Sequence, residues 1–70
     1  MADSVYKIID LVGSSELSWE DAAKKAVETA AKSLDDIRVV EVKQLDLKVE
    51  DGSVVLYRAR VNISFKYHTS

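Results

Sequence analysis

The last third of the chain alternates apolar and polar residues, the pattern of a β-strand with one buried face. One face is apolar throughout: Val55, Tyr57, Ala59, Val61, Ile63, Phe65 and Tyr67. The other is polar: Arg58, Arg60, Asn62, Ser64 and Lys66. Another strand is predicted from Ile37 to Glu50, and Asp51-Gly52 between the two strands tolerates the positive φ of a tight turn. The pattern therefore predicts a long hairpin that ends at Tyr67.

The predicted strand from Ile37 to Glu50 changes phase along its length. Val40 and Val42 share one parity, whereas the opposite parity carries Leu45, Leu47 and Val49. A change of parity moves the apolar side chains to the other face of a regular strand. Near Lys43-Gln44 we therefore expect either a β-bulge or a bend into a second packing environment.

The first half of the chain predicts a strand followed by a helix. Val5 to Val12 is apolar on both parities, and Gly13-Ser14-Ser15 is expected to end this strand. Ser18, followed three residues later by Asp21, is typical of a helix N-cap. The helix is predicted to run to about Leu34. Its apolar stripe consists of Trp19, Ala22, Ala23, Ala26, Val27, Ala30 and Leu34.

These elements predict a single α+β domain over residues 1–70 with the order strand, helix, strand, strand. A helical connection makes the first two strands parallel to each other. The sheet is fully antiparallel if the last strand lies between them. We therefore predict a three-stranded antiparallel sheet wrapped around one helix.

The size of the chain favours self-association. A 70-residue domain buries only about 60% of the surface of its unfolded chain. The chain has no cysteine, so disulfides cannot compensate for a small core. The predicted hairpin is also much larger than the one helix that could cover it. Association with further copies of the chain is the expected remedy.

Charge and hydropathy exclude several classes of partner. The net charge of −2 and the pI near 5.2 lack the basic stripe of a nucleic-acid-binding protein. The apolar runs are too short for a membrane span, and Met1 to Ser4 lack the features of a signal peptide. We therefore expect no nucleic-acid partner, no membrane partner and a cytoplasmic location.

The residues offer little for catalysis. His68 is the only histidine and is expected in a frayed tail, and the two glycines form no phosphate-binding loop. Ser14, Ser15 and Ser18 lie where a loop and a helix cap would place serines. We predict that the protein is not an enzyme.

Carboxylates are the more informative polar groups. Asp10 interrupts an apolar strand, Glu41 lies between valines, and Asp35-Asp36 follow the helix. In one interpretation Asp10 and Glu41 pair with basic residues on neighbouring strands and Asp35-Asp36 form a turn. In the other, carboxylates gather around a symmetry axis and bind a hard cation such as calcium or magnesium.

Two segments carry a family resemblance: Val5 to Ser15, with the sequence VYKIIDLVGSS, and Ser18 to Ala22, with the sequence SWEDA. The chain resembles a dodecin from these segments through to Phe65. The resemblance implies a subunit of the predicted fold within a hollow homododecamer. Dodecins bind flavins such as riboflavin, lumichrome or FMN in pairs, for storage or photoprotection rather than catalysis.

The chain departs from the family at the flavin site. Val39 stands where flavin-binding dodecins have the tryptophan that stacks on the ring, and Arg58 stands where a glutamine is usual. Gln44 matches a further polar contact, and Trp19 belongs to the helix-start motif, so it is no substitute. Because stacking is worth roughly 1–3 kcal/mol per ring, losing one ring on each side of a flavin pair costs about two to four powers of ten in affinity.

One branch of the family lacks this tryptophan, and its sequence at this point is similar to Asp35-Asp36-Ile37-Arg38-Val39 of this chain. The similarity implies calcium chelation without flavin. The first hypothesis is therefore a non-catalytic shell that binds or buffers a small ligand or cation, with Asp10, Asp36 and Glu41 as candidate calcium ligands. The alternatives are a flavin-storage dodecin that binds riboflavin or FMN weakly, and a structural shell without ligand.

Overall fold

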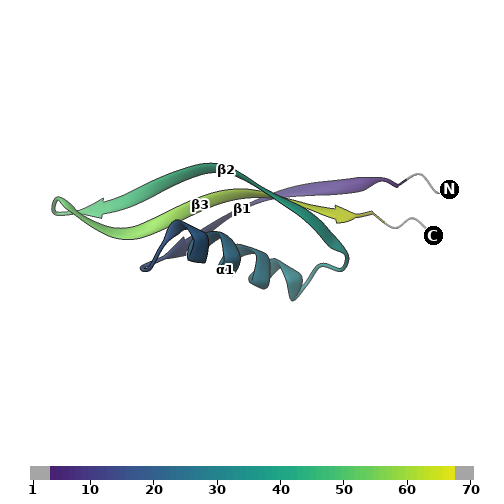
Figure 1. The fold of residues 1–70 in the computed structure, drawn as a ribbon, viewed down its shortest axis with the longest axis horizontal. Coiled ribbons are helices and arrows are strands. Elements are labelled where there is room, and N and C mark those ends of the chain that lie inside the picture. The colour runs from purple at the N-terminus through teal and green to yellow at the C-terminus, as the bar shows by residue number, and fades with distance from the viewer. Residues whose placement is uncertain (1–3, 68–70) are drawn as a thin grey trace.

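The structure, a computed structural model, describes residues 4–67. Strand β1 (Tyr6–Ser15) leads into helix α1 (Trp19–Ala31), which is followed by strands β2 (Ile37–Glu50) and β3 (Ser53–Lys66) (Figure 1). The predicted order of elements is confirmed. His68, expected in a frayed tail, lies outside the described residues.

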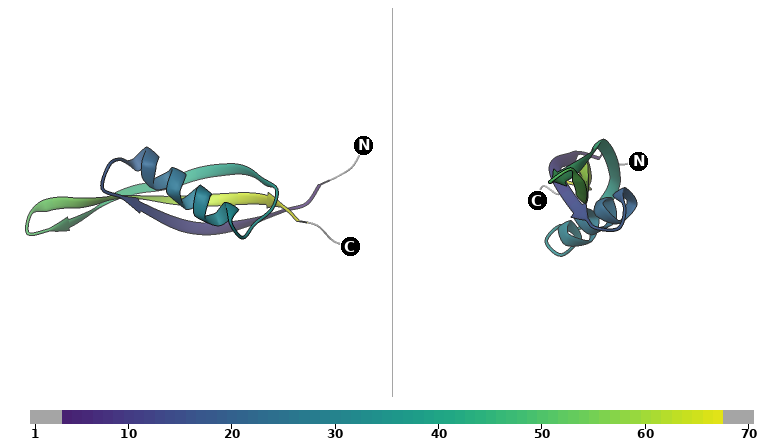
Figure 2. Two further views of the ribbon diagram at one scale, coloured as in Figure 1. Left: turned by 90° about the horizontal axis from the view of Figure 1, so that it is seen from below. Right: turned by 90° about the vertical axis from the view of Figure 1, so that its left-hand side faces the viewer.

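The three strands form one antiparallel sheet in the order β1-β3-β2, as predicted. The helix lies along one face of this sheet (Figure 2). Its buried residues meet the odd-numbered residues of β3 in a small core: Ala22, Ala26, Ala30, Ala59, Val61 and Ile63. The even-numbered residues of β3 point to the opposite face, because side chains alternate along a strand. We call this opposite face, which carries Arg58, Arg60, Asn62, Ser64 and their partners on β1 and β2, the open face.

Three irregularities interrupt the pairing of β2 with β3: one between Ile37 and Val39, and two nearer the turn that set the register of the hairpin. Asp51 and Gly52 form the predicted turn, with φ of 51° and 76°. Past the turn, a register shift leaves Val55 as an extra residue on β3, which interrupts the alternation predicted there. A second shift leaves Lys43 as an extra residue on β2 and reverses the first. The predicted phase change is therefore a bulge, and Leu45 and Leu47 stay on the helix side.

Strand β1 does not end at Gly13, contrary to the expectation from Gly13-Ser14-Ser15. It continues to Ser15, and Gly13 is a buried sheet residue opposite Ala59. A Cβ atom at Gly13 would overlap the main-chain carbonyl oxygen of Ala22 and would lie 3.0 Å from the Cβ of Ala26. The glycine therefore lets the helix lie directly on the sheet backbone.

Helix α1 is shorter than predicted, ending at Ala31 rather than near Leu34. The carbonyl oxygen of Ala30 accepts hydrogen bonds from the amides of Ser33 and Leu34 at 3.0 and 2.9 Å, which closes a turn. Asp36 then has a φ of 59°, a left-handed conformation that a helix cannot contain. Within residues 4–67, no helix has the length and hydropathy needed to cross a membrane.

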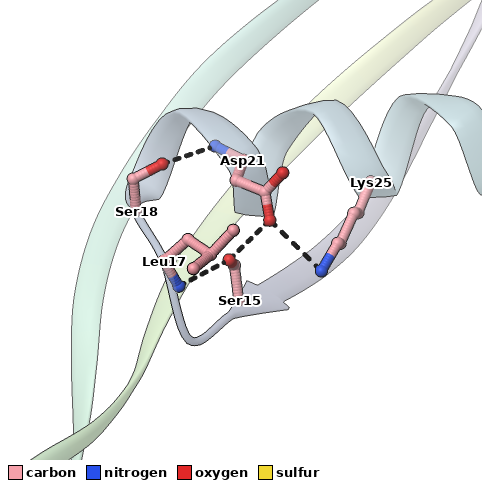
Figure 3. A network of polar contacts seen from close by, with 5 residues as sticks. All are labelled: Ser15, Leu17, Ser18, Asp21 and Lys25. Carbon is pink, nitrogen blue, oxygen red and sulfur yellow. Dashed lines mark hydrogen bonds and ion pairs between the residues drawn. The ribbon is translucent and has the colours of Figure 1, made fainter.

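A polar network fixes the start of α1 (Figure 3). The Ser18 hydroxyl accepts a hydrogen bond from the amide of Asp21 at 3.0 Å, which confirms the predicted N-cap. The buried Ser15 hydroxyl donates to the Asp21 carboxylate at 2.6 Å and accepts from the amide of Leu17 at 2.9 Å. Lys25 completes the network with an ion pair to Asp21 at 3.2 Å. The end of β1 is thereby joined to the first two turns of the helix.

Protonation of Asp21 is expected to weaken this network. The hydrogen bond from Ser15, and then Lys25, hold the pKa of Asp21 below its ordinary value of 3.8. A lowered folded pKa means that the stabilisation is complete above the unfolded pKa and is lost as pH falls through the folded value. Asp21→Asn should therefore lower the melting temperature at neutral pH, and the difference from the wild type should shrink below about pH 4. Thermal melts at one protein concentration would measure it. A difference that is constant with pH, or equally large in Glu20→Gln, would contradict the assignment.

Much of the apolar surface of the sheet is uncovered. The molecule is 54 Å long, and the turn end of the β2-β3 hairpin extends past the helix (Figure 1). Exposed apolar residues occupy the helix side of the hairpin: Val42, Leu45, Leu47, Val49 and Val54. Others occupy the open face: Tyr6, Ile8, Val12 and Val39. Both faces thus carry side chains that one subunit leaves in contact with water.

Candidate functional site

The three positions suggested for flavin contact all lie on the open face. Val39 is opposite Ser64, Gln44 is opposite Arg60, and Arg58 is opposite Asp46. Val39 is 60% exposed, so its side chain is accessible to a ligand. The face is therefore the same for all three residues, although their positions along the sheet differ.

Spacing separates these positions into two groups. Ser64, opposite Val39, and Arg58 are six residues apart on β3, which is about 20 Å at the rise of a β-strand. Gln44 is opposite Arg60, which is only two residues from Arg58 on β3. A single flat ring cannot contact both Val39 and Arg58 of one subunit. Any ligand that used both positions would have to lie between subunits.

Arg58 is held by Asp46, a residue that sequence reasoning missed. The Nε and Nη2 atoms of Arg58 donate to the two carboxylate oxygens of Asp46 at 2.7 and 3.2 Å. These bonds, and the negative charge of Asp46, raise the pKa of Arg58 above its ordinary value. Both side chains are partly exposed, at 44% and 42%. The guanidinium therefore already has an anionic partner before any ligand arrives.

The backbone beside this ion pair is fixed from the helix. The indole Nε1 of Trp19 donates to the carbonyl oxygen of Asp46 at 3.0 Å. The Trp19 ring also packs edge-on against Tyr57, the residue before Arg58, with centroids 5.3 Å apart. Trp19, which the sequence placed in the apolar stripe of the helix, thus joins the helix start to β2 and β3. Trp19 therefore contacts β2 at Asp46 and β3 at Tyr57, next to Arg58, and helps to fix the positions of Asp46 and Arg58.

Asp10 and Glu41 share one row of the open face. Asp10 is opposite Asn62 on one side, and Glu41 is opposite Asn62 on the other. Asp10 lies 3.5 Å from Arg60 on the neighbouring strand, as the ion-pair interpretation predicts. Glu41 instead pairs at 3.6 Å with Lys43 on its own strand. Both carboxylates have basic partners and both are exposed.

The third candidate carboxylate lies away from this row. Asp36 is in the turn before β2, where its backbone carbonyl accepts the amide of Lys66 at 3.1 Å. Its carboxylate also lies 3.6 Å from Arg38. Asp36 thus belongs to the turn that the sequence suggested for Asp35-Asp36.

The candidate calcium ligands of one subunit are too far apart for a closed site. Asp10 and Glu41 are two strand spacings apart, about 10 Å, whereas calcium holds its oxygen ligands at about 2.4 Å. Across residues 4–67, no three acidic, histidine or cysteine residues are grouped so that they could hold a metal ion. The assignment of Asp10, Asp36 and Glu41 stays a prediction, and it requires ligands from more than one subunit.

Comparison with known proteins gives consistent matches. A family model described as dodecin matches residues 5–68. Calcium dodecin of Mycobacterium tuberculosis is 48% identical over 63 residues, which cover 90% of this chain and 89% of that protein. A crystal structure of calcium dodecin from that organism, a calcium-chelating antigen with a novel calcium-binding site, has a TM-score of 0.84 and 46% identity over 96% of each chain. Dodecin from Streptomyces coelicolor has a TM-score of 0.93 and 27% identity over 100% of each chain.

Proposed function

The chain belongs to the dodecin family, and from this premise we propose that it forms a hollow homododecamer that binds or buffers a small ligand or cation without catalysis. Calcium is the proposed ligand. The observation that carries this choice is the likeness to calcium dodecin, which extends over nearly the whole chain. The residue at position 39 also supports this choice, because Val39 lacks the aromatic ring on which a flavin would stack.

Uncovered apolar surface supports self-association. Exposed apolar residues line both faces of the sheet, and a hollow lined by Trp19, Glu20, Ala23, Val42 and Leu45 lies where the helix meets β2. Monomeric proteins rarely leave such extended apolar surface in water. Because Val42 and Leu45 line this hollow and are each 49% exposed, a neighbouring subunit can cover them. Symmetric packing of identical subunits is the expected arrangement.

Oxygen ligands from symmetry-related copies would complete a calcium site. Each subunit offers the row Asp10, Asn62 and Glu41, with Asp36 in a separate turn. Calcium takes six to eight oxygen ligands, a number that one exposed row cannot supply. Around a symmetry axis, one carboxylate per subunit provides several ligands at once. The proposal therefore makes calcium binding dependent on assembly.

Native mass measurement and calcium titration test the proposal together. The assembled protein should have twelve times the 7.8 kDa mass of the chain. After dialysis against a chelator, calorimetry should detect heat with calcium and none with riboflavin at micromolar concentration, because flavin binding without a stacking ring is expected to be weaker than micromolar. The double variant Asp10→Asn, Glu41→Gln should lose most of this heat, whereas Glu50→Gln near the hairpin turn should retain it.

Other outcomes would select an alternative. Quenching of riboflavin fluorescence at micromolar protein would favour flavin storage and contradict the calcium proposal. Absence of heat with calcium, magnesium, flavin and nucleotide would favour a structural shell. A stable single subunit in dilute solution would contradict the dodecamer.

A further inference from the structure

Positive charges on the open face are matched by carboxylates around its central hollow. The hollow is lined by Asp10, Lys43, Gln44, Arg60 and Asn62. Three basic residues in and beside it have a carboxylate within 4 Å: Arg58 with Asp46 at 2.7 Å, Arg60 with Asp10 at 3.5 Å and Lys43 with Glu41 at 3.6 Å. The hollow is therefore rich in hydrogen-bonding groups, and its basic residues are locally neutralised.

The tightest of these pairs is also the best fixed. Asp46 takes two parallel hydrogen bonds from Arg58, the geometry in which a guanidinium binds a carboxylate or a phosphate most strongly. The bond from Trp19 to its main-chain carbonyl holds Asp46 in position. Asp46 therefore occupies the fork of Arg58 that an anionic ligand would otherwise use.

We propose that Asp46 is a selectivity residue that excludes phosphate-bearing ligands from the open face. A phosphate at Arg58 would have to displace the carboxylate or lie close beside it. If the phosphate displaces the carboxylate, it must compete with Asp46 for the two hydrogen bonds of the Arg58 guanidinium. If the phosphate lies beside the carboxylate, it is repelled by a like charge. Uncharged ligands and cations do not incur this cost. This inference rests on the proposed function, because it assumes that the open face binds the ligand.

Riboflavin and FMN provide matched probes, since FMN adds only a phosphate. Asp46→Asn keeps the size of the side chain and removes its charge, which leaves Arg58 free to bind an anion. We expect FMN affinity to rise about tenfold in Asp46→Asn, and riboflavin affinity to change by less than about twofold. Quenching of flavin fluorescence measures both. The gain should diminish at high salt, because it is electrostatic.

Three further variants isolate the effect. Glu50→Gln removes one carboxylate near the hairpin turn, 3.6 Å from Lys48, and should leave the ratio of FMN to riboflavin affinity unchanged. Asp46→Asn combined with Arg58→Gln should lose the gain. Arg58→Gln alone leaves Asp46 as an unpaired anion and should lower FMN affinity relative to riboflavin. Native mass measurement on each variant checks assembly.

The outcomes are separable from those of the proposed function. A ratio that stays constant in Asp46→Asn and Arg58→Gln, an equal gain in Glu50→Gln, or no FMN binding by Asp46→Asn at millimolar ligand would each overturn the role of Asp46. If the wild type gave no heat with calcium, the calcium proposal would be overturned. The ratios of FMN to riboflavin affinity would still decide the role of Asp46.

Discussion

Gly13→Ala is expected to destabilise the subunit by about 3 kcal/mol, because the added methyl group has no space. It would overlap the main-chain carbonyl oxygen of Ala22 and press on the Cβ of Ala26. A main-chain atom cannot rotate away as a side chain can, so the whole helix would have to move off the sheet. That movement would also separate the helix from Ala59, the residue opposite Gly13. Thermal or urea unfolding would measure the loss.

A matched control exists at the next residue. Ser14→Ala changes an exposed side chain of the same strand and should alter stability by less than about 0.5 kcal/mol. If Gly13→Ala were as stable as Ser14→Ala, the close approach of helix to sheet would be wrong. Native mass measurement would add a second readout, since a displaced helix also disturbs the surface beside Val42 and Leu45.

Val39→Trp is expected to raise riboflavin affinity by about two to four powers of ten if each ligand pair gains a ring on both sides, since stacking is worth roughly 1–3 kcal/mol per ring. Val39 is exposed on the open face, so a larger side chain can be accommodated there without entering the core. Riboflavin fluorescence quenching measures the change directly.

Val39→Leu is the control for this substitution, because it adds apolar surface without an aromatic ring. Its riboflavin affinity should stay near that of the wild type. Unchanged affinity in Val39→Trp, with the native mass intact, would show that the absent ring is not the reason for weak flavin binding. Equal gains in both variants would attribute the effect to apolar contact alone.

Local patterns were sufficient to predict most of the fold. Alternation gave the two long strands, the apolar stripe of alanines gave the helix, and Asp51-Gly52 gave the turn. The helical connection predicted that β1 and β2 are parallel to each other, and a fully antiparallel sheet then required β3 between them, which is confirmed. Each of these features depends on residues that are near one another in sequence, or on a general rule of chain connection.

The Asp46-Arg58 pair could not be predicted, because it depends on a bulge. Counting back from the turn without irregularities would place Asp46 opposite Tyr57. The extra residue Val55 shifts the register by one and places Asp46 opposite Arg58. The second bulge at Lys43 restores the original register, and only this one left a visible change of phase in the sequence.

The place of Gly13 inside β1 could not be predicted either, for a related reason. A glycine followed by two serines is typical of a strand end, and nothing nearby in the sequence indicates a helix lying on top of it. Only the packing of Ala22 and Ala26 reveals why a side chain is excluded there. The need for glycine at such a position arises from contacts with residues that are distant in the sequence. The residues next to Gly13 in a single sequence do not indicate those contacts.

The strand order has a consequence for the protein before assembly. With β3 in the centre, β1 and β2 each keep one border of unpaired main-chain amides and carbonyls along most of their 10 and 14 residues. The chain has no proline to interrupt either border. Such borders are templates for indiscriminate strand addition. Newly made subunits are therefore at risk of forming insoluble aggregates, and rapid assembly into the proposed homododecamer would shorten the time for which single subunits are exposed to this risk.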